Sequence, residues 1–472
     1  KELDEIEKNA LNKSKELRDK SWKNYRKSIE GDLNDAMVIL TRIAQNSPKN
    51  KKEIIDVRDQ LSKTIQPLKS DIFKSLKYTQ RIIRNENNIS KNYLLNLIEE
   101  LKNKYKIQYS SHLYSESNFS VDKIKEVKPL YPTQNKLVDG REVINKFFDI
   151  TFSNNPLVFA VGEDVGTIGG VNQGFAGIQK KYGKLRITDT GIRESSIIGQ
   201  GIGAALRGLR PIVEIQYLDY VYWALQTLSD DLSTLQYRTK GGQKAPVIIR
   251  TRGHRLEGIW HSGSPMGTLI NSLRGINILV PRNFVEASGM YNTLLLSDEP
   301  GIVIEPLNAY RLKENLPENL DKVAVEFGVP EIIRDGKDIT IVTYGSMCKI
   351  VLEAASQLNE IGISCEVIDV RTLIPFDKNK MIVESIKKTN RVVFADEDVS
   401  GGASAYMMQS VIENQDAYFY LDSKPLTIHS NDHRPAYSTD GDYFSKPNCE
   451  SVFEKIYLLF NELNPKAFPS LN

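Results

Sequence analysis

Apolar residues recur at helical spacing through the first hundred or so residues of the chain. Residues 1–27 are densely charged and carry few apolar positions, which is typical of a solvated helix. Residues 33–46 are more apolar and can gather one apolar face on a helix. Further amphipathic helices are predicted at residues 52–65, 69–85 and 90–104. We therefore predict a helical extension over residues 1–109, without a catalytic constellation.

The pattern changes after a polar, proline-containing stretch, which predicts a linker over residues 110–135. From Asp139 onward, β-rich apolar runs such as residues 301–306 alternate with helical segments such as residues 218–239 and 285–297. This alternation predicts parallel sheets covered by helices. We expect one such domain over residues 136–320 and a smaller one over residues 321–472. The predicted fold class is α/β, with two doubly wound parallel-sheet domains preceded by the α-helical extension.

One stretch, residues 186–220, combines a strand, a turn, a helix and a second strand: RITDTGIRESSIIGQGIGAALRGLRPIVEIQYLDY. Its helix is predicted to end at Gly208, because glycine accepts the positive φ that follows many helices. Glu194 lies where the first strand gives way to the helix. In an open α/β sheet that position faces the crevice where ligands bind. The alternative is a solvated carboxylate that the helix dipole favours.

Composition excludes several classes of function. The 472 residues carry a formal net charge of +2, so no nucleic-acid or anionic-membrane partner is expected. No apolar run is long enough to span a bilayer. Cys348, Cys365 and Cys449 are scattered, which supports neither disulfides nor a zinc site and favours a reducing cytoplasm. The chain opens at Lys1, without a signal peptide and within a helical pattern, so we expect a further segment upstream.

Candidate chemistry gathers in the first α/β domain. His261, in the loop WHSGSP, can act as a general acid or base, although a structural histidine is an equal alternative. His254 lies between two arginines, which favour a neutral ring or mark an anion-binding loop. Gln216 and Tyr220 follow the strand after Glu194, and together these groups suit a heteroaromatic ring.

Two other groups of residues are weaker candidates for a binding or catalytic site. The glycines of residues 166–174 do not have the spacing of a dinucleotide or phosphate loop. In the second α/β domain we find no nucleophile, base or metal cluster. Four polar residues near its end are expected to have a structural role or to line an interface: Asp432, His433, Arg434 and Asp440.

Several motifs in series resemble a known family: GEDVG, residues 182–220, APVIIRT, WHSGSP, VTYGS and CEVIDVRTLIPFD. The chain from about residue 139 to 463 is similar to the β subunit of the decarboxylating component of 2-oxo acid dehydrogenases, which use thiamine diphosphate. The resemblance implies that Glu194 is the catalytic glutamate and that His261 is the active-site histidine. It places Ile192, Gln216 and Tyr220 against the cofactor's pyrimidine ring. Gly263 departs from the family, which has glutamine there.

The same resemblance implies that the site is shared. The family binds Mg²⁺ and the diphosphate through a GDG motif on its α part, and this chain has no GDG. We therefore expect no metal ligands here, and an α-type portion that holds Mg²⁺. Residues 1–131 look like the tail of that portion, as in fused versions of the enzyme. A lipoyl acyltransferase core is a further expected partner.

Small residues on one helix suggest association between copies of the chain. Gly199 and Gly203 share one stripe, and Gly201 and Ala205 share another. Such stripes allow close helix packing, either across a two-fold axis or against the helix's own sheet. The resemblance favours a homodimer.

Two other functions stay open: a transketolase-like ketol transferase, and a non-catalytic assembly subunit. Among 2-oxo acid substrates, branched-chain acids are the first expectation and pyruvate is the second. The α half would carry much of the substrate pocket.

Overall fold

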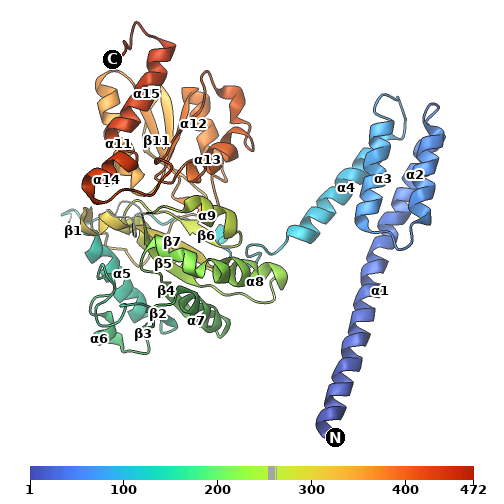
Figure 1. Cartoon of the computed structure of the whole chain (residues 1–472), viewed down its shortest axis with the longest axis horizontal. Coiled ribbons are helices and arrows are strands. Elements are labelled where there is room, and N and C mark those ends of the chain that lie inside the picture. The colour runs from blue at the N-terminus through green and yellow to red at the C-terminus, as the bar shows by residue number, and fades with distance from the viewer. Residues whose placement is uncertain (135, 254–260, 262, 472) are drawn as a thin grey trace. The chain divides into compact units, whose positions relative to one another are not determined.

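The computed structural model describes residues 1–134, 136–253, 261 and 263–471. The chain forms two compact units, Lys1–Ser111 and His112–Asn472 (Figure 1).

The first unit is a helical hairpin bundle, as its amphipathic pattern predicts. Residues 2–24 of its long first helix are exposed, and burial begins near Ile29. The buried carboxylate of Asp32 accepts a hydrogen bond from the Tyr105 hydroxyl at 2.9 Å. The second half of the first helix therefore packs into the bundle. The four helices of this unit confirm the predicted helical extension. The helices are α1 (Glu2–Gln45), α2 (Lys51–Lys63), α3 (Lys69–Ile82) and α4 (Lys91–Ser110).

The larger sheet of the second unit has the strand order β12-β6-β7-β5-β4-β2-β3. Neighbouring strands are parallel except at the edge, where β12 runs antiparallel to β6. The central strands are buried on both faces, as their continuous apolar runs predict. The strands are β2 (Val158–Gly162), β3 (Ile187–Asp189), β4 (Arg210–Glu214), β5 (Ile248–Gly253), β6 (Asn277–Leu279), β7 (Gly301–Pro306) and β12 (Thr372–Ile374).

Helices and short turns cover this sheet on both faces (Figure 1). A two-stranded pairing of β1 (Leu137–Asp139) with β8 (Lys313–Asn315) lies beside it. The covering elements are α5 (Gly140–Asn154), α6 (Ile178–Tyr182), α7 (Glu194–Leu206), α8 (Ser233–Arg238), α9 (Met266–Ser272), α10 (Phe284–Leu296), and the shorter turns η2 (Leu218–Ala224), η3 (Thr227–Leu232) and η4 (Leu307–Arg311).

The smaller sheet has the order β14-β13-β10-β11-β9, with β9 antiparallel and the other pairs parallel. The two sheets and their helices confirm the predicted α/β class, with an antiparallel strand at one edge of each. The elements are β9 (Glu331–Arg334), β10 (Ile339–Thr343), α11 (Met347–Glu360), β11 (Cys365–Asp369), α12 (Met381–Thr389), β13 (Val392–Ala395), α13 (Ala403–Ile412), η5 (Ala417–Tyr420), β14 (Leu426–Ile428), α14 (Ser438–Ser445) and α15 (Cys449–Leu463).

The segment 218–239, which its apolar spacing predicts as one long helix, is irregular instead. It begins as the 3₁₀ turn η2, continues as the π-helical turn η3 and ends in α8. The prediction of one helix is wrong here, because spacing alone does not separate α-helical from 3₁₀ or π turns. Irregular turns of this kind often carry functional side chains.

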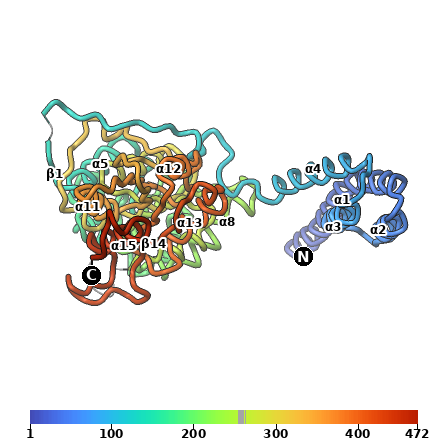
Figure 2. Tube along the Cα trace, turned by 90° about the horizontal axis from the view of Figure 1, so that it is seen from above, coloured from blue at the N-terminus to red at the C-terminus, as the bar shows by residue number. Residues whose placement is uncertain are grey.

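The polar segment before the first α/β domain lies along the second unit over residues 112–134 (Figure 2). Val127 forms a backbone bridge with Ala324. The Asp122 and Glu126 carboxylates pair with Lys378 at 2.7 Å and Arg371 at 2.8 Å. The Ser117 hydroxyl also donates to Oδ2 of Asp298 at 2.7 Å, so this segment is fixed to both α/β domains.

The two small-residue stripes of α7 have different surroundings. A Cβ at Gly201 would lie 2.5 Å from the Val213 Cγ1 atom of β4, so this stripe packs against the helix's own sheet. Positions 199 and 203 are exposed, and a Cβ there would meet no atom within 4 Å. The stripe of Gly199 and Gly203 is therefore accessible, and the homodimer stays a prediction.

Two alanine substitutions on α7 should have opposite effects on stability. We expect Gly201→Ala to destabilise the fold by about 1–3 kcal/mol, because the new methyl group overpacks the contact with Val213. We expect Gly199→Ala to stabilise it by roughly 0.5–1 kcal/mol, because alanine is the better helix former and the position is open. Urea unfolding of the two variants measures both. Equal shifts of the same sign would contradict this packing of the helix.

Candidate functional site

The candidate site lies at one edge of the larger sheet, where three neighbouring parallel strands end. Glu163 directly follows β2, Gln216 comes two residues after β4, and Glu194 is the first residue of α7, after β3. Because the strand order is β4-β2-β3, the carboxyl ends of these strands lie side by side. This edge is the usual place for ligands in open α/β sheets.

Two buried carboxyl groups lie near each other at this edge. Glu194 is 7% exposed, in the first turn of α7, where the helix dipole favours a negative charge. Glu163 is 8% exposed, and its Oε1 atom has no hydrogen-bond partner among the residues that the structure describes. Burial raises the pKa of Glu163, and the charge of Glu194 raises it further. The pair is therefore suited to holding a proton or a hydrogen-bond donor.

Sequence reasoning singled out Glu194 and missed Glu163. The missed signal is the motif GEDVG, which places an acid directly after a buried strand. Its neighbour Asp164 accepts a hydrogen bond from the Gln216 amide at 3.1 Å, so the predicted glutamine is tied to the same turn.

Tyr220 and His261 form a second cluster. The Tyr220 hydroxyl lies 2.8 Å from Nε2 of His261, and the ring centroids of Tyr217 and His261 are 4.4 Å apart. Burial raises the pKa of Tyr220, and the charges of Glu163 and Glu194 add to the effect. The phenol therefore stays protonated near neutral pH, within electrostatic reach of both acids. The structure thus brings Glu194, Tyr220 and His261 to one region.

Two other predicted residues stand apart from this cluster. Ile192 is 82% exposed in this chain, so its predicted contact with a pyrimidine ring would have to form with the cofactor or a partner present. His254 lies outside the described residues.

A buried ionic network supports the backbone at this edge of the larger sheet. Arg250 and Arg252 project from the same side of β5, and both contact the carboxylate of Glu214. Arg250 also binds Glu305 at 2.9 Å, and Arg252 Nη1 donates to the Gln216 carbonyl at 2.9 Å. The network therefore fixes the backbone that carries Gln216. Its sequence signal is a pair of arginines two residues apart within an apolar strand.

The glycine that departs from the family pattern has a local physical reason. The backbone N–H of Gly263 donates to Oδ2 of Asp219 at 2.8 Å. A Cβ at position 263 would lie only 2.1 Å from Oδ1 of the same carboxylate. A side chain and this carboxylate cannot both occupy the space, so the glycine belongs to the observed geometry.

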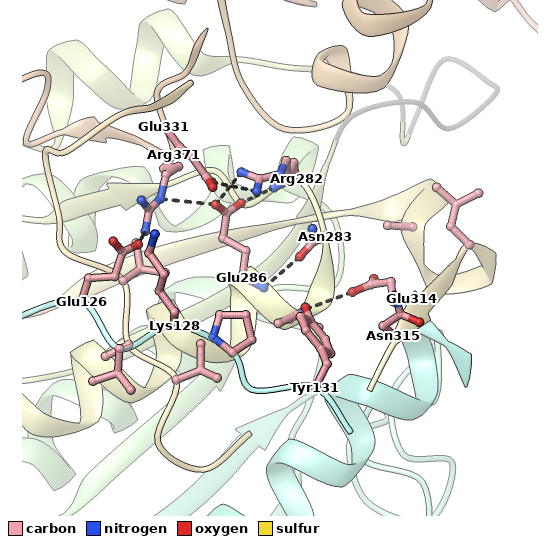
Figure 3. Close-up of a pocket in the computed structure, with 18 of the residues that line it drawn as sticks. Glu126, Lys128, Tyr131, Arg282, Asn283, Glu286, Glu314, Asn315, Glu331 and Arg371 are labelled. Carbon is pink, nitrogen blue, oxygen red and sulfur yellow. Dashed lines mark hydrogen bonds and ion pairs between the residues drawn. The ribbon is translucent and has the colours of Figure 1, made fainter. Parts of the chain in front are cut away.

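A separate cavity lies elsewhere, beside residues 126–131 (Figure 3). Its volume is about 510 Å³, and Arg282 and Glu286 line it. Arg282 pairs with Glu286 at 3.0 Å and with Asp369 at 2.7 Å, and Glu286 also contacts Arg371 at 3.3 Å. Burial raises the pKa of Glu286 to about 7 against the opposing effect of the arginines. This cluster joins the two α/β domains and lies apart from the candidate site.

Among the described residues, no three or more His, Cys, Asp or Glu side chains are grouped to hold a metal ion. No helix in the described part of the chain is long and apolar enough to cross a bilayer.

The two linked α/β domains and the acid-lined strand edge define a transketolase-like protein. The transketolase pyrimidine-binding domain family matches residues 136–313, and the transketolase C-terminal domain family matches residues 328–448. Among solved structures, a split-gene transketolase described as an inactive β4 tetramer superposes with a TM-score of 0.53 at 20% identity, over 69% of this chain and 99% of that one. This likeness concerns the fold.

Curated relatives narrow the class. The chain is 32% identical over 284 residues to the 2-oxoisovalerate dehydrogenase subunit beta of Bacillus subtilis, covering 60% of this chain and 86% of that protein. It is 31% identical over 288 residues to the pyruvate dehydrogenase E1 component subunit beta of Acholeplasma laidlawii, with the same coverage. The chain belongs to the family of β subunits of 2-oxo acid dehydrogenase decarboxylating components.

Proposed function

We propose that this chain supplies the β-type half of a lipoyl-acylating 2-oxo acid dehydrogenase and binds the aminopyrimidine side of thiamine diphosphate. The observation that supports this most is the buried carboxyl group of Glu194 at the strand edge, beside Glu163 and the Tyr220–His261 pair. Carboxyl groups in such a site can hold a proton against a ring nitrogen. Tyr220 and the Gln216 amide complete a polar and aromatic lining.

The residues present fit one part of the cofactor. Glu194 would hold the pyrimidine ring, with Ile192, Gln216 and Tyr220 around it, and the bound cofactor would supply the electron sink for decarboxylation. The sequence lacks the GDG motif through which the family binds Mg²⁺ and the diphosphate, so we assign those contacts to an α-type portion. That portion, a lipoyl acyltransferase core and a second copy of this chain are the proposed partners. The cytoplasm is the proposed location.

Within the site, this chain's own groups have distinct roles. Glu194 would hold a proton at the pyrimidine nitrogen. His261 would donate or stabilise charge during acyl transfer to the lipoyl group, and its Nε2–Tyr220 contact orients the ring. Because Glu163 is buried, a proton shared between Glu163 and Glu194 is favoured.

Replacing the histidine should separate two partial reactions. We expect His261→Ala to slow acyl transfer to a lipoyl acceptor by about 10²-fold, because general acid–base groups typically contribute that much or more. Decarboxylation measured with an artificial electron acceptor should fall much less. Parallel rate measurements with the two acceptors test this. Equal losses in both would assign His261 to the decarboxylation step instead.

Substrate choice tests the function as a whole. The assembled enzyme should decarboxylate 2-oxoisovalerate best and pyruvate second, and 2-oxoglutarate poorly. Transfer of a ketol unit to an aldose would support the transketolase-like alternative. No turnover of any 2-oxo acid by the enzyme assembled with its α-type portion would refute the proposal.

A further inference from the structure

The segment that carries His261 is held at three successive points. Tyr220 contacts His261 at 2.8 Å, and the neighbouring Asp219 accepts from the Gly263 N–H at 2.8 Å. Further along, the Gly267 N–H at the start of α9 donates to Oδ2 of Asp398 at 2.8 Å. Two anchors come from η2 and the third from the loop after β13. Both α/β domains therefore fix the position of this segment.

The middle anchor is itself tied to the smaller domain. Oδ1 of Asp219 accepts a hydrogen bond from Nη1 of Arg434 at 2.8 Å. The side chain of Asp219 is only 5% exposed, whereas that of Arg434 is 47% exposed. A charge-assisted bond to a buried carboxylate is stronger and more directional than an exposed ion pair.

Arg434 is placed by the loop on which it lies. Asp432 accepts hydrogen bonds from the backbone and hydroxyl of Ser400, at 3.0 and 2.6 Å. The Ser430 N–H donates to the Asp398 carbonyl at 2.8 Å. The loop of Arg434 and the third anchor, Asp398, are thus joined directly.

We propose that Arg434 is a positioning residue, which acts through Asp219 and Gly263 to hold His261 in place for acyl transfer. The proposal rests on the proposed function. It also explains the glycine at position 263, since a Cβ there would displace the carboxylate that joins the two domains. The series of hydrogen bonds from Arg434 through Asp219 to Gly263 makes the position of His261 depend on the smaller domain.

The test uses the full chain assembled with its α-type portion. Arg434→Gln removes the charge, Arg434→Lys keeps it, and Lys424→Gln removes an exposed cation of the same domain that pairs with Glu462 at 3.5 Å. We expect Arg434→Gln to lower kcat for lipoyl acylation about ten-fold, because small displacements of a catalytic group are costly. Decarboxylation with an artificial acceptor and the KM for the 2-oxo acid should change less than about two-fold. Arg434→Lys should recover much of the rate, and Lys424→Gln should behave like the parent enzyme.

A second measurement does not depend on activity. Hydrogen exchange at the Gly263 amide should be faster in Arg434→Gln than in the parent chain, and near the parent rate in Lys424→Gln. An active parent enzyme whose Arg434→Gln variant matches it in acylation and exchange would overturn the proposal, as would equal losses in both partial reactions. A parent enzyme that turns over no 2-oxo acid would instead refute the proposed function, and the exchange result would still decide whether Arg434 orders this segment.

Discussion

Glu194→Gln in the assembled enzyme should lower the rate of 2-oxo acid decarboxylation by at least about 10²-fold. Glutamine keeps the size of the side chain and removes its ability to exchange a proton, which is the property that the proposed role requires. The carboxyl group is buried at the strand edge, so solvent cannot readily replace it. The rate is measured with an artificial electron acceptor, which isolates decarboxylation from acyl transfer.

Glu142→Gln is the matched control for this experiment. Glu142 also lies in the first turn of a helix, α5, but it is exposed and away from the strand edge. Its substitution should leave decarboxylation unchanged. If Glu194→Gln behaves in the same way while the parent enzyme is active, the chain is an assembly subunit and its acid has no catalytic role.

Arg250→Met should destabilise the chain by about 3–5 kcal/mol. The guanidinium is fully buried and lies between the carboxylates of Glu214 and Glu305. Burial lowers the pKa of Arg250, but these two acids raise it well above the usual value, so the group stays charged. Removing one partner of a buried ionic cluster leaves uncompensated charge, which is costlier than the lost attraction alone. Chemical denaturation gives the change in the free energy of unfolding.

A surface ion pair provides the comparison. Lys387 pairs with Glu384 at 2.7 Å on the exposed side of α12. Lys387→Met should leave the unfolding midpoint close to that of the parent, because exposed pairs contribute little. Similar midpoints for both variants would show that the buried network does not support the site edge.

The local pattern of apolar and polar residues predicted much of the fold, because the burial of one face or of a whole strand imposes that pattern on the sequence. The run GIVIEP predicts a strand at Gly301–Pro306, which is β7, and the helix predicted from residue 285 to 297 is α10 within one residue at each end. The positive φ at Gly208 likewise confirms the predicted end of α7. In each case the sequence over a few residues decides the structure.

Features that depend on distant partners could not be predicted in this way. β12 is only three residues long, and it forms a strand because it finds the open edge of β6. The buried arginines of β5 read as polar interruptions until Glu214 and Glu305 are placed beside them. Glu163 becomes a site residue only because β2 and β3 are neighbours. Glu194 was accessible to sequence reasoning because its strand, turn and helix are contiguous.

The most direct test measures thiamine diphosphate binding, with Mg²⁺ present, by calorimetry. The titrations use this chain alone, the α-type portion alone and their mixture. If one protein surface holds the ring of the cofactor and another holds its diphosphate, thiamine diphosphate should bind tightly only to the mixture. Glu194→Gln should weaken that binding. Tight binding to this chain by itself, or a mixture whose affinity is no greater than that of its parts, would contradict a divided site.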